Sequence, residues 1–337
     1  MRHNRARKFR VRTKRFQVAL LLTAALAPIG AAIAADKLDE SRAIREIERL
    51  GGRFERDEKL PGRPFRVIIS GSDASRTFGD KDVPLLRAIN NLTELDLRKT
   101  AVTDAGLNDL GQLTKLTKLH VISVQTTDAS LKQLRSLKGL TELYVGRNKI
   151  TNSGLKELGK LTNLTLLHVN STKITDAGLK ELRPLTKLVE LNLSNNPITD
   201  AGLKELKPLT NLMELDLSNT QITDAGLKEI GHLTKMIKLW LMQTQIADAG
   251  LKELSQFQSL GRFWLSGTRV TDSGLKELRQ LKGLKRLFLN QTHITDAGLN
   301  DLREFKNLTH LGLRDTQLTD AGLRELSHSL PRVNIER

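Results

Sequence analysis

The chain has 337 residues, no cysteine, 4% aromatic residues and a formal net charge of +16. The lack of cysteine excludes disulfide bridges, thiolate metal sites and a lipid-modified N-terminal cysteine. The charge alone would suggest nucleic acid, but residues 1–35 carry eight Lys and Arg residues and no acid, which is half of the basic excess. We therefore expect no nucleic-acid partner.

Residues 1–34 have the pattern of a secretory signal peptide. A basic head precedes the apolar run VALLLTAALAPIGAAIA, which ends at Ala34 before a polar stretch. We expect cleavage after Ala34, membrane contact only through this export signal, and a periplasmic, cell-surface or secreted protein. The alternative is an uncleaved anchor, but the run is short for a span and is interrupted by Pro28 and Gly30.

The segment after the leader predicts a cap for a larger array. Within residues 41–50, four apolar residues share one helical face, and Gly51-Gly52 ends the helix. Residues 65–69 then alternate as a strand does. We assign residues 35–64 to an N-terminal capping helix and loop, and residues 65–91 to a degenerate first repeat.

From residue 92 onward, one pattern recurs every 24 residues without insertion or deletion. Each unit contains LxxLxL, which predicts a short strand, then a polar turn residue, then TDAGLKEL, which predicts a short helix. Thr223 or Asp224 is the expected helix cap in its unit. We assign residues 92–331 to ten repeats and residues 332–337 to a C-terminal cap. The units begin at Leu92, Leu116, Leu140, Leu164, Leu188, Leu212, Met236, Leu260, Leu284 and Leu308.

The pattern LxxLxLxxTxITDAGLKEL resembles the leucine-rich repeat, in a bacterial variety similar to the repeats of F-box leucine-rich repeat proteins. One unit cannot bury its own leucines, so stacked units must share a core. The resemblance implies an α/β fold, a right-handed solenoid or horseshoe with a parallel concave sheet and short convex helices. It also implies protein recognition through the concave sheet, and no catalytic residue in the repeat frame.

Two polar positions recur in nearly every unit. A threonine or asparagine at the turn can satisfy backbone groups where the strand ends. An aspartate opens every predicted helix except one, which has Asn152; it can act as a cap or complement the helix dipole, although a row of carboxylates would also suit calcium. Repeat two departs from the pattern at Val124, Thr126 and Ser130, where we expect a local distortion.

The columns predicted to face the concave side vary instead of repeating. Position five of the units holds both tryptophans and the one tyrosine of the chain, and strand spacing allows neighbouring rings to stack. We predict a binding hot spot formed by Trp240, Trp264, Phe288, Lys238, Arg262, Arg286 and Met242. The secondary binding candidates are His120, Tyr144 and His168.

One alternative role of the rings and two expected absences accompany this hypothesis. The rings could serve only to stabilise the sheet. His120 and His168 could suggest a metal, but they lie two strands apart, too far for one zinc, so we expect no metal. Phosphate loops, dinucleotide fingerprints, HExxH and GxSxG are missing, so we expect no enzyme and no cofactor.

The sequence thus predicts an exported, non-enzymatic protein that binds a protein or peptide on its concave face. The first alternative is binding of carbohydrate or an anionic cell-envelope polymer, because rings and cations suit both ligands. The second is a purely structural envelope component.

Overall fold

The computed structural model describes residues 39–56, 65–69 and 78–337, all of which belong to one compact unit, Leu38–Arg337. The predicted signal peptide at residues 1–34 lies outside these ranges. No helix in the described part of the chain is long and apolar enough to cross a membrane.

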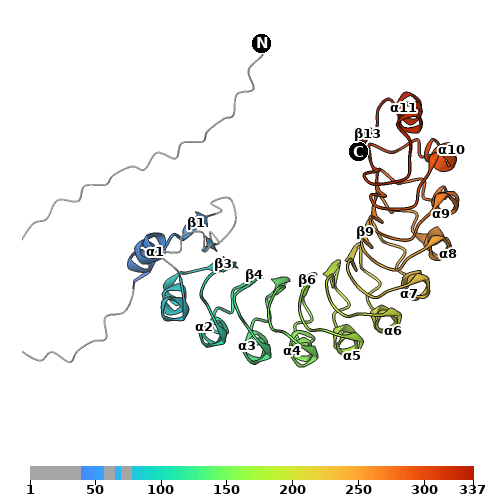
Figure 1. The fold of residues 1–337 in the computed structure, drawn as a ribbon. Coiled ribbons are helices and arrows are strands. Elements are labelled where there is room, and N and C mark those ends of the chain that lie inside the picture. The colour runs from blue at the N-terminus through green and yellow to red at the C-terminus, as the bar shows by residue number, and fades with distance from the viewer. Residues whose placement is uncertain (1–38, 57–64, 70–77) are drawn as a thin grey trace, which may run out of the picture. The chain divides into compact units, whose positions relative to one another are not determined.

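The described strands form a single sheet in chain order (Figure 1). β1 pairs with β2 in the antiparallel direction, and every later pair is parallel. From β3 to β13 each residue pairs with the residue 24 positions later, as Arg262 does with Arg286. The strands are β1 (Arg53–Arg56), β2 (Phe65–Ile68), β3 (Leu92–Asp96), β4 (Lys118–His120), β5 (Glu142–Tyr144), β6 (Leu166–His168), β7 (Glu190–Asn192), β8 (Glu214–Asp216), β9 (Lys238–Trp240), β10 (Arg262–Trp264), β11 (Arg286–Phe288), β12 (His310–Gly312) and β13 (Asn334–Glu336).

Within this unit the strands lie on the inner side of the arc and the helices on the outer side (Figure 1). The helices are α1 (Glu40–Arg49), α2 (Asp104–Leu110), α3 (Asp128–Leu134), α4 (Asn152–Leu158), α5 (Asp176–Leu179), α6 (Asp200–Leu203), α7 (Asp224–Ile230), α8 (Asp248–Leu251), α9 (Asp272–Leu278), α10 (Leu299–Leu302) and α11 (Asp320–Ser329). Short 3₁₀ helices are η1 (Asp80–Ala88), η2 (Lys180–Leu182), η3 (Lys204–Leu206), η4 (Lys252–Gln256) and η5 (Asp296–Gly298). The predicted solenoid of parallel strands and short outer helices is confirmed.

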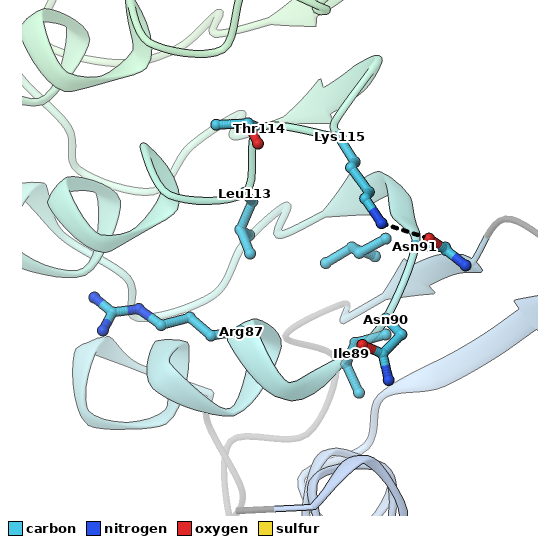
Figure 2. A pocket seen from close by; sticks show the side chains of 8 residues that line it. Arg87, Ile89, Asn90, Asn91, Leu113, Thr114 and Lys115 are labelled. Atoms are coloured by element: carbon cyan, nitrogen blue, oxygen red, sulfur yellow. Dashed lines mark hydrogen bonds between the residues drawn. The ribbon is translucent and has the colours of Figure 1, made fainter.

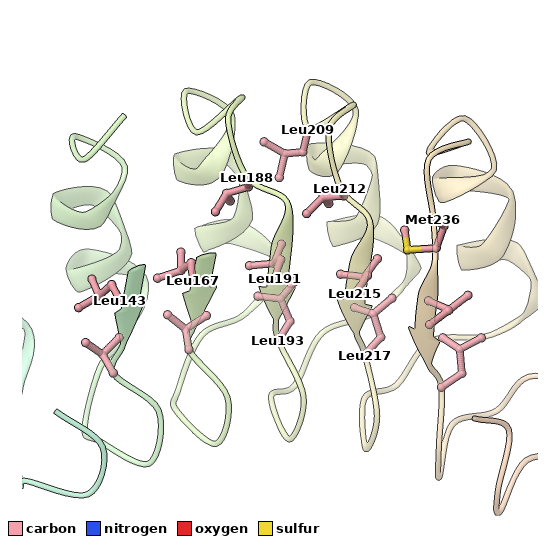
Figure 3. Packing of buried hydrophobic residues seen from close by; sticks show 14 of the residues in the cluster. Leu143, Leu167, Leu188, Leu191, Leu193, Leu209, Leu212, Leu215, Leu217 and Met236 are labelled. Carbon is pink, nitrogen blue, oxygen red and sulfur yellow. The ribbon is translucent and has the colours of Figure 1, made fainter. Parts of the chain in front are cut away.

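The core consists of leucine rows that run from repeat to repeat (Figure 3). Leu191 and Leu215 are at most 1% exposed, and Met236 fills the position that leucine holds in other units, fully buried. Each buried leucine contributes about 1.5–3 kcal/mol relative to an exposed one. Because each row is shared by neighbouring units, this stabilisation exists only in the stack.

Of the two predicted caps, the threonine is the one that caps its helix, and the aspartate lies in the first turn. The N-cap is the threonine one residue earlier: Thr223 Oγ1 accepts a hydrogen bond from the Ala225 N–H. The aspartate reaches the next repeat instead. Asp200 Oδ1 accepts from the Thr223 N–H at 2.8 Å, and Asp200 Oδ2 accepts from the Thr223 hydroxyl at 2.6 Å.

This bridge also explains the glycine of the TDAGL motif. A Cβ at Gly226 would lie 2.4 Å from Asp200 Oδ1, closer than real Cβ contacts come. Repeat two has Ser130 at that position, and its hydroxyl donates to the Thr127 carbonyl oxygen at 3.0 Å. The aspartates are therefore explained by contacts between repeats, without calcium.

The polar turn column satisfies backbone groups as predicted. Thr220 Oγ1 donates to the Leu217 carbonyl oxygen at 2.6 Å. Val124 has no such group, but Asn148 of the next repeat accepts from the Val124 N–H at 3.1 Å and donates to the Val121 carbonyl oxygen at 2.6 Å. The strand register around β4 is unbroken, but the turn after it is locally irregular as predicted: Gln125, between Val124 and Thr126, has a φ of 55°, in addition to the left-handed Ser123 that other repeats match.

Candidate recognition face

The three predicted rings form one stack on the inner face of the sheet. Trp240 ends β9, Trp264 ends β10 and Phe288 ends β11, so the parallel register places them side by side. The Trp240 and Trp264 ring centroids lie 4.5 Å apart at 11°, and those of Trp264 and Phe288 lie 5.5 Å apart at 8°. All three side chains are half-buried. Trp264 therefore has a ring against each of its faces.

The cations predicted beside this stack differ in whether they form ion pairs. Lys238 Nζ lies 2.6 Å from Glu214 Oε1, in the neighbouring strand, so its charge is neutralised. Arg262 is exposed and Arg286 is half-buried, and neither takes part in an ion pair among the described residues. Met242 is half-buried. The structure thus brings the predicted hot spot together but leaves only the two arginines as available cations.

His120, Tyr144 and His168 form a second ring cluster nearer the N-terminus. His120 stacks on Tyr144 with centroids 3.9 Å apart, whereas His168 meets Tyr144 edge-on at 4.7 Å. Burial lowers the pKa of His120 to about 4 and raises the pKa of the Tyr144 hydroxyl. Both His120 ring nitrogens are buried and have no hydrogen-bond partner among the described residues.

Most carboxylates on the inner face of β3 to β8 are paired. The pairs on this face are Arg66 with Glu94, Arg98 with Asp96, Lys118 with Glu142, His168 with Glu190, and Lys238 with Glu214. The hydrogen bond with His168 holds the pKa of the Glu190 carboxyl below its ordinary value despite burial. Asp216 differs, because it forms no ion pair with a described residue and only accepts from the Ser218 N–H at 3.0 Å.

Between the two ring clusters lies a hollow of about 250 Å³, called here the acidic hollow. His168 and Trp240 line it together with residues of the two strands between them, Glu190, Leu191, Asn192, Glu214 and Asp216. The hollow exists because the ring column is interrupted by two short side chains, those of Asn192 and Asp216. The sequence analysis missed it, although these two short residues between large rings were a readable signal.

Two exposed apolar residues, called here the apolar strip, directly precede strands that line the acidic hollow. Val189 is 36% exposed and Ile237 is 39% exposed, and they are the exposed large hydrophobic residues of the described chain. Each immediately precedes a hollow-side strand, β7 or β9. The sequence analysis did not predict this strip.

Another hollow, of about 180 Å³, lies away from the ring stack, beside the end of η1 (Figure 2). Arg87, Ile89 and Leu113 line it, and Lys115 Nζ donates to Asn91 Oδ1 at 2.6 Å across its rim. It brings together no rings and no carboxylates. Within the described ranges, no group of three or more His, Asp or Glu residues is placed to hold a metal ion.

Comparisons with known proteins agree with this architecture. A model described as leucine-rich repeats in two copies matches residues 186–229, and a leucine-rich repeat model matches residues 88–111, 140–159, 160–182 and 306–327. No curated protein matches the chain.

Among solved structures, an internalin (inlF) from Listeria monocytogenes is 21% identical, with a TM-score of 0.58 over 88% of this chain and 94% of the internalin. A structure described as a TDR receptor is 17% identical, with a TM-score of 0.52 over 76% of this chain and 43% of the receptor. At these identities the likeness concerns the fold. The matched repeats and the stacked parallel strands make this chain a leucine-rich repeat protein.

Proposed function

We propose that this chain is a non-enzymatic recognition protein that binds a protein or peptide on its inner sheet face. The observation that carries the proposal is the stack of Trp240, Trp264 and Phe288 beside two arginines without ion pairs. Tryptophan, tyrosine and arginine are enriched where binding energy concentrates in protein interfaces. Repeat solenoids present extended concave surfaces of this kind to partners.

We further infer that residues 1–34 direct export, so that the partner is met in the periplasm, at the cell surface or outside the cell. The support is the basic head and apolar run of the leader. The division into a cap at residues 35–64, a degenerate repeat at residues 65–91 and the regular repeats remains part of this proposal.

The ring geometry favours a protein or peptide over a carbohydrate. A sugar stacks on an open ring face, but the near-parallel rings of Trp240, Trp264 and Phe288 cover one another. The stack presents mainly ring edges, and Trp240 also lines the acidic hollow. An anionic polymer would depend on exposed cations such as Arg262, and its binding would weaken steeply with salt.

The test is an affinity capture from envelope and secreted fractions of the source organism, with the full chain as bait. The matched variants are Trp240→Ala with Trp264→Ala on the inner face, and Lys180→Ala with Lys204→Ala on the exposed outer face. Circular dichroism checks that each remains folded. Proteins captured by the wild type are then titrated individually by calorimetry.

We expect the inner-face variant to lose at least about 30-fold in affinity, as for hot-spot residues worth 2 kcal/mol or more. The outer-face variant should bind as the wild type does. Equal capture by all three proteins would show that the rings only stabilise the sheet. Capture of polysaccharide or no protein would support the polymer-binding or structural alternative.

A further inference from the structure

We propose that the acidic hollow seats a lysine or arginine side chain of the partner. The inference rests on the proposed function and specifies what that partner must present. It is carried by three independent features of repeats five to seven: a carboxylate without an ion pair, a tryptophan in the lining and the apolar strip.

The charge of the hollow is the first feature. Glu190 and Glu214 line it but are bonded to His168 and Lys238, each at 2.6 Å. Asp216 keeps one carboxylate oxygen without a hydrogen-bond donor among the described residues, because only its Oδ1 accepts, from the Ser218 N–H. Asp216 is therefore the carboxylate of the lining that has neither a cation nor an imidazole as partner among the described residues. A guanidinium or ammonium group would supply the missing donors and the opposite charge.

The wall of the hollow is the second feature. Trp264 covers one face of Trp240, and Trp240 also lines the hollow. A cation within about 6 Å of an indole face is attracted by the ring quadrupole, and tryptophan is the strongest aromatic partner for this contact. Carboxylate and indole thus favour the same kind of ligand group from two sides. The hollow of about 250 Å³ is narrow enough to select one long side chain rather than a folded surface.

The apolar strip is the third feature. Val189 and Ile237 are exposed next to Glu190 and Lys238, the residues that begin β7 and β9. Val189 precedes Asn192 by three positions, roughly 10 Å along a strand. An extended partner segment with a basic residue in the hollow can therefore place an aliphatic residue about three positions away on the strip.

The test uses a positional-scanning library of acetylated, amidated nonapeptides, so that terminal charges do not compete for the site. The full chain is compared with Asp216→Asn. This variant should fold normally, because Asn192 occupies the equivalent position one repeat earlier and accepts a hydrogen bond from the Ser194 N–H in the same way. The control is Glu253→Gln. Glu253 is exposed on the outer face, and its substitution removes one negative charge, as Asp216→Asn does. A third variant, Asp216→Lys, reverses the charge.

We expect the wild type to enrich arginine or lysine at one position and an aliphatic residue about three positions away. Asp216→Asn should bind those peptides about tenfold more weakly, as for the loss of one charge-assisted hydrogen bond, while Glu253→Gln binds as the wild type does. Asp216→Lys should exchange the basic preference for Asp or Glu.

Enriched peptides without a basic residue, or equal binding by Asp216→Asn, would overturn this inference and leave the proposed function standing. Enrichment of no peptide by any variant, together with unchanged capture by the tryptophan double variant, would overturn both. A basic preference lost in Trp240→Ala but kept in Asp216→Asn would assign the cation to the indole alone and contradict the role of the carboxylate.

Discussion

At the scale of single residues, His120 is the group with the clearest dependence on pH. Burial, opposed mainly by Asp96, lowers its pKa to about 4, whereas an unfolded chain has an ordinary histidine. Between pH 6.5 and pH 4 the unfolded state therefore binds a proton that the folded state does not. Stability from this group is complete above about pH 6.5 and is lost as pH falls toward 4.

We predict that the free energy of unfolding drops between pH 7 and pH 4.5 by more in the wild type than in His120→Phe. The difference should be on the order of 1–2 kcal/mol, after allowing for the solvent screening of a half-buried group. Phenylalanine keeps a ring against Tyr144 but has no proton to bind. Urea titrations at both pH values measure the free energy of unfolding. An equal drop between the two pH values in both proteins would contradict the assignment to His120.

A second prediction concerns Gly267, whose φ of +70° lies in the left-handed region. We expect Gly267→Ala to destabilise the protein by about 1 kcal/mol, because a Cβ is unfavourable at this φ. A Cβ there would also lie 2.2 Å from Gln243 Nε2, which hydrogen-bonds Gln291 across this position. Gly267→Asn should cost less, since Asn195 and Asn219 adopt the same conformation in their own repeats. Thermal denaturation compares the two variants, and equal losses would mean that the side-chain clash dominates.

At the scale of the element, α8 is the helix on which repeat-to-repeat bridging can be tested. Its N-cap is Ala247, so no hydroxyl caps the helix, and Asp224 accepts only from the Ala247 N–H, at 2.7 Å. We predict that Ala247→Thr raises the free energy of unfolding by about 0.5–2 kcal/mol, by restoring the cap and the hydroxyl bond to Asp224. The control is Ala247→Val, which has the shape of threonine but no hydroxyl. A gain of the same size from valine would attribute the effect to packing.

The elements show how far the sequence could specify this structure. LxxLxL predicted the strands and TDAGL the helices, because a constant repeat length turns each position into a column with one environment. The partner of Asp200 could not be deduced from its own unit, since Thr223 belongs to the next one. The acidic hollow and the stacking of the rings depend on side-chain conformations. The repeat period predicts which residues are neighbours but not these conformations. The pairing of Glu214 with Lys238 was foreseeable, because the two residues are neighbours in one column.

At the scale of the whole molecule, the described repeats make contacts mainly with the units before and after them. The ends differ: α1 buries Ala43 and Ile47 beside the first strands, and β13 finishes the sheet. β1, which the sequence analysis did not predict, covers the edge of β2. Such a stack unfolds as a chain of coupled units, whose stability is the sum of unit terms and neighbour interfaces.

This coupling leads to a prediction about local stability. Leu215→Ala removes a buried side chain from the middle of the core, which should cost about 2–5 kcal/mol. We expect amide hydrogen exchange, followed by mass spectrometry, to accelerate most in β7 to β9 and least in β3 and β12, because the cavity weakens interfaces with adjacent repeats first. The strands that accelerate are those that line the acidic hollow, so binding of a partner there should restore their protection. Uniform acceleration along the whole chain would show instead that the repeats unfold as a single cooperative unit.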